Sequence, residues 1–140
     1  MKKRKLSVLV VDDEASVLFT YRILLERHGY AATAALTSKQ AVAAINLTAF
    51  DLLLCDLSLE EGHTGFDVLE YARQSDPDVP CVLITGYATS EAAQKAEHMG
   101  IAVLYKPIEI QEFLDTISTV LRTSYEQTEN RKRAQRSKAS

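Results

Sequence analysis

Polar side chains that can bind a cation or take part in phosphoryl transfer follow several short apolar segments of this 140-residue chain. Two adjacent carboxylates, Asp12 and Asp13, follow the first apolar segment, and Asp56 follows a later one. Thr85 and Lys106 come just after two further apolar runs. Carboxylates that lie close together repel one another, and a lysine or a hard divalent cation relieves that repulsion. These residue types therefore predict a site for a phosphoryl group and Mg²⁺, for which Mn²⁺ can substitute.

Short apolar runs alternate with segments of helical periodicity along the chain. The runs indicate buried strands at residues 6–11, 30–35, 51–55, 80–84 and 101–104. Helical spacing predicts helices at residues 15–28, 38–46, 66–73, 90–99 and from 109 onward, with Ser38 capping the second. This alternation predicts an α/β fold, (βα)5, with a doubly wound five-stranded parallel sheet. Ligands of such sheets bind outside the carboxyl ends of the strands, so the five polar residues are expected on one rim.

Charge is distributed unevenly along the sequence. The net charge is −3, but the first five residues contribute +4 and residues 126–140 contribute +3, which leaves −10 for residues 6–125. An acidic body argues against specific DNA binding by the folded part. No apolar stretch is long enough to span a membrane.

The domain is expected to occupy residues 6–123, after a basic segment at residues 1–5. Residues 124–140 form a polar, basic tail, either a helix extension or disordered, and we expect fraying beyond Tyr125. Cys55 and Cys81 lie within apolar runs. They indicate buried, reduced thiols of a cytoplasmic protein.

Four short motifs stand in a fixed order in the sequence: DD after the first strand, D after the third, T after the fourth and KP after the fifth. Each motif alone fits a turn, a helix cap or a strand end. Together they resemble the receiver domain of bacterial two-component response regulators, over about residues 5–123. The resemblance implies a flavodoxin-like, CheY-like sheet with strand order 2-1-3-4-5, in a stand-alone receiver.

The resemblance also implies a role for each matching residue. Asp56 is the implied phosphoacceptor and a metal ligand. Asp13 binds Mg²⁺ directly, Asp12 helps through water, and the backbone carbonyl of Ser58 completes the ligands. Lys106 bridges to Asp56 or its phosphoryl group.

Further implied roles concern the switch and the connection after the last strand. Thr85 turns toward the phosphoryl group after transfer, and the bond before Pro107 is cis. Many relatives carry an aromatic residue three positions before the lysine, where this chain has Val103; Tyr105 is not assigned that role. Ser58 and Tyr87 flank the path of the attacking water in the family, and we hypothesise that Tyr87 shields the acyl phosphate.

The implied function is a phosphorylation switch, not an enzyme in the usual sense, that catalyses its own phosphorylation and autodephosphorylation. The donor is a histidine kinase or a histidine phosphotransfer protein, and a downstream protein binds the surface of the fourth helix, fifth strand and last helix. We expect a monomer or weak homodimer.

Several alternatives remain open. The chain can be a relay intermediate or the detached receiver of a hybrid histidine kinase. A flavin- or nucleotide-binding protein would need a glycine-rich loop after the first strand, and VVDDEAS has no glycine. An aspartyl phosphatase would carry a second Asp where Ser58 stands.

Overall fold

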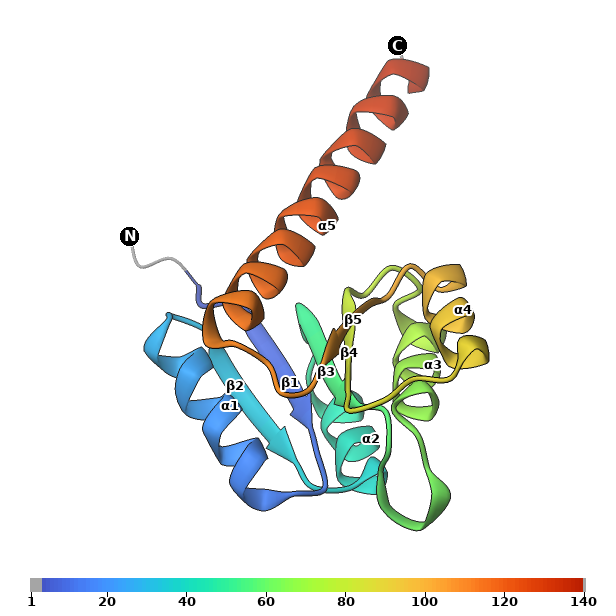
Figure 1. Cartoon of the computed structure of the whole chain (residues 1–140). Coiled ribbons are helices and arrows are strands. Elements are labelled where there is room, and N and C mark those ends of the chain that lie inside the picture. The colour runs from blue at the N-terminus through green and yellow to red at the C-terminus, as the bar shows by residue number, and fades with distance from the viewer. Residues whose placement is uncertain (1–3, 140) are drawn as a thin grey trace.

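Five segments rich in Val, Leu, Ile and Ala form one parallel sheet in the computed structural model, which describes residues 4–139 (Figure 1). The strands are β1 (Ser7–Val11), β2 (Ala31–Ala35), β3 (Leu52–Asp56), β4 (Cys81–Thr85) and β5 (Ala102–Tyr105). Their order is β2-β1-β3-β4-β5, and all neighbours pair in parallel. The predicted α/β class and the strand order 2-1-3-4-5 are confirmed.

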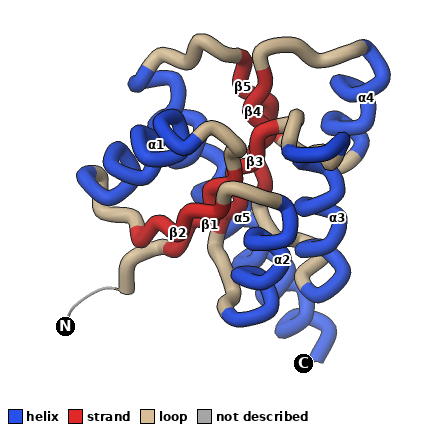
Figure 2. Tube along the Cα trace, turned by 90° about the horizontal axis from the view of Figure 1, so that it is seen from below, coloured by secondary structure: helices blue, strands red, loops and turns tan. Residues whose placement is uncertain are grey.

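Helices cover both faces of this sheet. They are α1 (Ala15–Arg27), α2 (Ser38–Leu47), α3 (Gly65–Ser75), α4 (Ser90–His98) and α5 (Ile110–Ala139), with a short 3-10 turn, η1 (Glu60–Gly62), before α3. Figure 2 shows α2 and α3 side by side across the sheet from α1. In the described part of the chain, no helix is both long and apolar enough to cross a membrane.

Alternate residues of each strand face opposite helical layers, because successive side chains of a strand point to opposite faces. Val8 and Val10 of β1 pack in the cluster that includes Phe113 of α5, whereas Leu9 of β1 packs with residues of α2 and α3. All five residues of β3 are buried, which explains why the central strand begins with the unbroken apolar run Leu52–Cys55 before it ends at Asp56. The two cores fix the strands in register, and with them the side chains at their carboxyl ends.

The ends of the elements differ from the sequence predictions by one or two residues. Asp56 and Thr85 are the last residues of their strands, not the first residues beyond them. The prediction that Ser38 caps the second helix is wrong. Thr37 is the N-cap, because its backbone is extended and its hydroxyl accepts a hydrogen bond from the Gln40 N–H at 3.0 Å.

The end of the chain differs most from expectation. Helix α5 has 30 residues, or about 45 Å of length at the usual rise per residue, and extends well past the sheet in Figure 1. The expected fraying beyond Tyr125 is therefore wrong, and residues 124–139 form the helix extension. Residues 126–139 contain no Gly or Pro and are rich in good helix formers. An ion pair of 2.5 Å between Arg131 and Asp78 also ties this segment to the body.

Stability is expected to fall in alkaline solution. Both cysteines are buried free thiols; burial raises the pKa of Cys81 to about 11 and holds that of Cys55 well above its usual value. Burial also raises the pKa of Tyr21. A group whose folded-state pKa is raised holds its proton more tightly in the folded chain. Its contribution is complete below the unfolded-state pKa, about 9 for a thiol, and is lost as the pH rises through the folded-state value.

We therefore expect the free energy of unfolding in urea to be level from pH 7 to about 9 and to decline between pH 9 and 11. A Cys81→Ala variant, although less stable at pH 7, should lose less stability over the same interval. Equal stabilities of the native chain at pH 8 and 10.5 would contradict this expectation.

Candidate functional site

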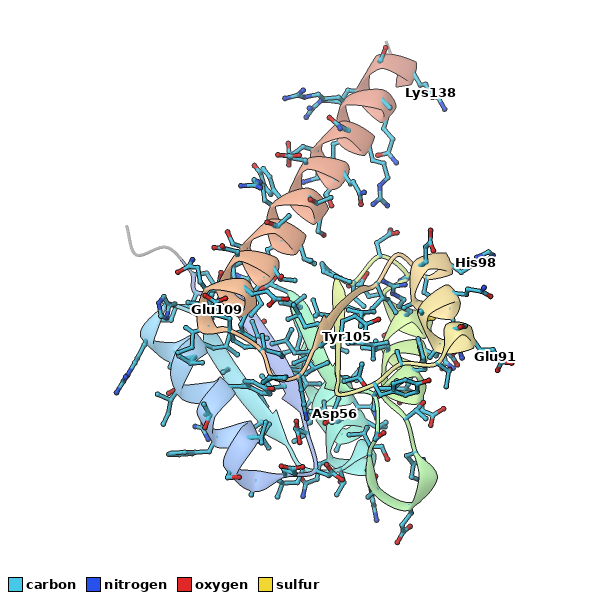
Figure 3. The ribbon with its side chains drawn as sticks, in the orientation of Figure 1. Asp56, Glu91, His98, Tyr105, Glu109 and Lys138 are labelled. Atoms are coloured by element: carbon cyan, nitrogen blue, oxygen red, sulfur yellow. The ribbon has the colours of Figure 1, made fainter. Side chains whose placement is uncertain are left out.

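Three segments bring charged side chains together at the carboxyl end of the sheet. Asp12 follows β1, Asp56 ends β3, and Lys106 follows β5. The Lys106 Nζ lies 2.7 Å from Asp56 Oδ2 and 3.4 Å from Asp12 Oδ2. Figure 3 shows Asp56 within the folded body, well away from Lys138, which lies near the end of α5. The ammonium group thus links two carboxylates that come from different strands.

A third carboxylate completes an oxygen-rich cluster. One carboxylate oxygen from each of Asp12, Asp13 and Asp56 lies within 4.8 Å of the other two. Asp12 and Asp56 are buried, with 1% and 7% of their surface exposed, whereas Asp13 is exposed. Carboxylate oxygens converging on one point are the donors that a hard divalent cation prefers. The residues present therefore fit Mg²⁺, and Mn²⁺ by the same chemistry.

The electrostatics of the cluster agree with that fit. Burial raises the pKa of Asp12, and the nearby charge of Asp56 raises it further, against the lowering effects of the Glu14 N–H and Lys106. Burial alone would lower the pKa of Lys106, but its hydrogen bond to Asp56 and the charges of both carboxylates outweigh burial and raise it. Lys106 therefore stays protonated and balances only part of the negative charge. A bound cation would balance more of it.

The loop after Asp56 turns back sharply on itself. The Ser58 N–H donates to Asp56 Oδ1 at 2.9 Å, and Ser58 forms an antiparallel bridge with Thr64. The Gly65 N–H then donates to the Leu57 carbonyl at 2.9 Å, where α3 begins. The structure thus places Ser58, the residue whose carbonyl is the implied metal ligand, in a hairpin directly beside Asp56.

Thr85 ends β4 on the same rim, but its hydroxyl is engaged locally. It donates to the Tyr87 carbonyl at 2.7 Å and accepts from the Tyr87 N–H at 3.2 Å. Among the described residues, the Thr85 hydroxyl forms no hydrogen bond with Asp56 or Lys106. Tyr87 itself is 77% exposed. The structure thus shows the hydroxyl turned to its own loop.

The last strand places two more residues beside Thr85. The Lys106 N–H donates to the Thr85 carbonyl at 2.8 Å, which holds the lysine next to β4. The peptide bond between Lys106 and Pro107 is cis. Tyr105, which the sequence left without a role, pairs with Thr85 in the parallel register and is half exposed (Figure 3). Only the strand register reveals that pairing.

Sequence reasoning also missed Glu60, in the loop after Asp56. Its carboxylate accepts hydrogen bonds from Ser38 at the start of α2. The two residues are 22 positions apart, and no local pattern connects them. The contact therefore could be found only from the folded chain.

Comparisons with known proteins agree with this geometry. The family model of the response regulator receiver domain matches residues 8–118. Among solved structures, a CheY-like receiver domain protein from Methanospirillum hungatei superimposes with a TM-score of 0.83 at 28% identity, covering 89% of this chain and 99% of that one. NtrX from Brucella abortus, solved in complex with ATP, has a TM-score of 0.82 at 27% identity, covering 90% of this chain and 29% of that one.

Curated relatives are longer proteins. The transcriptional regulatory protein ZraR of Salmonella typhimurium is 30% identical over 122 residues, which are 86% of this chain and 27% of ZraR. The alginate biosynthesis transcriptional regulatory protein AlgB of Pseudomonas aeruginosa is 37% identical over 101 residues, 71% of this chain and 22% of AlgB. The chain thus spans about a quarter of the length of these relatives. Fold, site geometry and family match agree, and the chain belongs to the response regulator receiver domain family.

Proposed function

We propose that this chain is a phosphorylation switch in which Asp56 accepts a phosphoryl group from a phosphohistidine. The donor is a histidine kinase or a histidine phosphotransfer protein, and the transfer requires Mg²⁺. One observation carries the proposal: the buried Asp56 carboxylate lies 2.7 Å from the Lys106 ammonium and shares its oxygen cluster with Asp12 and Asp13. A buried nucleophile flanked by an ammonium and a cation site is the minimum equipment for phosphoryl transfer.

In the transfer step, an Asp56 carboxylate oxygen attacks phosphorus, and the bond from phosphorus to the donor imidazole nitrogen breaks. The bonding electron pair returns to the imidazole nitrogen, and the new bond is an acyl phosphate. Lys106 holds its ammonium where it can donate to a phosphoryl oxygen. Asp12, Asp13, Asp56 and the Ser58 carbonyl would hold Mg²⁺, which when bound offsets negative charge on the phosphoryl oxygens.

Phosphorylation would then change the loop after β4. A phosphoryl group adds strong hydrogen-bond acceptors next to Thr85. If the Thr85 hydroxyl turns toward that group, it gives up its bond to the Tyr87 carbonyl. The loop leads into α4, in which only Ala96 is buried, so this helix is weakly held. The surface of α4, β5 and α5, with its exposed Tyr105 and Ile110, then favours a different partner.

The direct test is to incubate the native chain with acetyl phosphate and Mg²⁺ and to measure its intact mass. We expect a single phosphoryl adduct that requires the cation and disappears when a chelator is added first. Beryllofluoride binding provides an independent check. A folded, Mg²⁺-loaded chain that never gains the adduct from any phosphodonor would refute the proposal.

The same site fits two positions in a signalling pathway. The chain can end the pathway by binding a downstream protein, or it can pass its phosphoryl group to a histidine as a relay intermediate or detached receiver. We place it in the cytoplasm, as a monomer or weak homodimer without specific DNA binding of its own. It is not a classical enzyme, since it catalyses only its own phosphorylation and dephosphorylation.

We further propose that Tyr87 protects the acyl phosphate from water. Its ring is exposed two positions after Thr85, beside the path that we infer for the attacking water. Replacing Tyr87 by Ala should shorten the lifetime of the adduct roughly tenfold, equivalent to about 1.4 kcal/mol of the hydrolysis barrier. Decay of the adduct after removal of the donor measures that lifetime. The control is Tyr125→Ala, which alters another exposed tyrosine, on α5, and should leave the lifetime of the adduct unchanged. An unchanged lifetime in Tyr87→Ala would contradict the proposed protection.

A further inference from the structure

Glu60 connects the loop that follows Asp56 to the start of helix α2. Its Oε1 accepts a hydrogen bond from the Ser38 backbone N–H at 2.5 Å, and its Oε2 accepts one from the Ser38 hydroxyl at 3.2 Å. Ser38 is the first residue of α2, whose position is fixed by the fully buried Ala41. The loop is thereby attached to a rigid part of the fold.

The start of α2 is well suited to hold this carboxylate. The first N–H groups of a helix have no partner within the helix, and the helix dipole places partial positive charge there. The Thr37 hydroxyl takes only the Gln40 N–H, and α2 has no acidic residue of its own in its first turn. Glu60 therefore supplies from another segment both the acceptor and the negative charge that this helix start lacks.

The rest of the loop is held mainly by bonds within itself and to the start of α3. The Leu59 N–H donates to the His63 carbonyl at 2.9 Å, and Thr64 and Asp67 form a capping box. Glu61 adopts a left-handed backbone with φ of 51°, which makes the turn tight. In residues 4–139, the hydrogen bonds from this loop to α2 are those made by Glu60. At its base, the loop is held to the body by the Leu57 N–H, which donates to the Ile84 carbonyl at 2.9 Å, and by the Ser58 N–H, which donates to Asp56 Oδ1. Nearer its tip, Glu60 adds its hydrogen bonds to the packing of the buried Leu59.

We propose that Glu60 is a positioning residue: through Ser38 it fixes the loop so that the Ser58 carbonyl is presented to the cation. The inference rests on the proposed function, because it concerns the Mg²⁺ site of the same phosphoacceptor. An ion that uses a loop carbonyl binds only the fraction of molecules in which the loop is correctly placed, so a mobile loop weakens binding. Residues that orient metal ligands typically account for about tenfold in affinity or more.

The test compares two neighbouring glutamates in the full-length chain. Glu60→Ala removes the attachment, whereas Glu61→Ala removes an equal charge one position away. The Glu61 carboxylate is exposed and makes no hydrogen bond or ion pair within the described residues. Titration calorimetry with Mg²⁺ at constant ionic strength should show a dissociation constant about tenfold higher than native in Glu60→Ala. In Glu61→Ala, the dissociation constant should stay within about twofold of the native value. Equal losses in the two variants would mean that bulk charge is responsible, and would overturn the proposal.

A conservative variant and a second measurement separate positioning from general support of the fold. Glu60→Gln keeps an oxygen that can accept the Ser38 N–H, and should retain most of the Mg²⁺ affinity. Hydrogen exchange of the backbone amides at residues 57–65 should be faster in Glu60→Ala than in the native chain, without Mg²⁺ in either sample. Urea unfolding reports whether the fold as a whole has weakened.

The outcomes distinguish this inference from the proposed function. If native protein binds no Mg²⁺, the proposed function fails. If native protein binds Mg²⁺ and Glu60→Ala binds it equally well, only the positioning role of Glu60 fails. A variant that is less stable, yet exchanges these amides and binds Mg²⁺ as the native chain does, would also reduce Glu60 to an ordinary structural contact.

Discussion

Replacing Asp56 by Asn will abolish the phosphoryl adduct formed with acetyl phosphate and Mg²⁺, while the chain stays folded. Asn is nearly the same size as Asp, so the packing at the end of β3 should be kept. An amide, however, lacks the carboxylate oxygen that must attack phosphorus, and it removes the charged partner of Lys106 at 2.7 Å. Intact mass measures the adduct, and circular dichroism checks the fold.

A matched control removes a carboxylate that lies elsewhere. Asp115 on α5 is exposed, accepts a hydrogen bond from the Gln111 side chain and is not one of the three clustered aspartates. Asp115→Asn should therefore gain the adduct as the native chain does. If Asp56→Asn were modified to the same extent as Asp115→Asn, a different side chain would be the acceptor.

The second large effect is expected from adding a single methyl group, in Gly65→Ala. A Cβ atom on Gly65 would lie 2.5 Å from the Asp56 backbone oxygen and 2.8 Å from Leu83 Cδ2. Because the nearest atom belongs to the backbone of a buried strand, it cannot move aside as a flexible side chain would. We expect a loss of about 3 kcal/mol in the free energy of unfolding, at the upper end of typical overpacking costs.

Urea unfolding at neutral pH tests this prediction, and Gly86→Ala is its control. A Cβ atom on Gly86 would have no heavy atom within 4 Å, and its backbone conformation suits any residue. The control should therefore stay within about 0.5 kcal/mol of the native chain. Similar stabilities for the two alanine variants would show that the start of α3 can move away from β3 without cost.

The sequence contained enough information to predict the sheet and the rim of the site. Strands of a parallel sheet are covered on both faces, so β3 and β4 stand out as short runs of apolar residues. Because the strand order places β1, β3, β4 and β5 side by side, the polar residues that follow them had to meet. That reasoning is enough to bring Asp12, Asp56 and Lys106 together.

The remaining features depend on contacts between segments that are distant in sequence. No local sequence pattern predicts the contact of Glu60 with the start of α2, because its partner, Ser38, is 22 residues away. The choice of Thr37 over Ser38 as the cap depends on backbone angles, since both side chains can serve. Polarity was a poor guide at the end of the chain. There, helix propensity and the ion pair of Arg131 with Asp78 favour order over fraying.

The length of α5 also separates charges of opposite sign. Its last turns carry Arg133, Arg136 and Lys138, and Figure 3 shows Lys138 on the projecting part of α5, well away from Asp56 in the folded body. A molecule charged in this way has a permanent electric dipole moment, and the field of a charged partner will rotate it before contact. Adding a phosphoryl group at the acidic end enlarges that dipole. Encounter rates with charged partners should therefore depend on the phosphorylation state most strongly at low ionic strength.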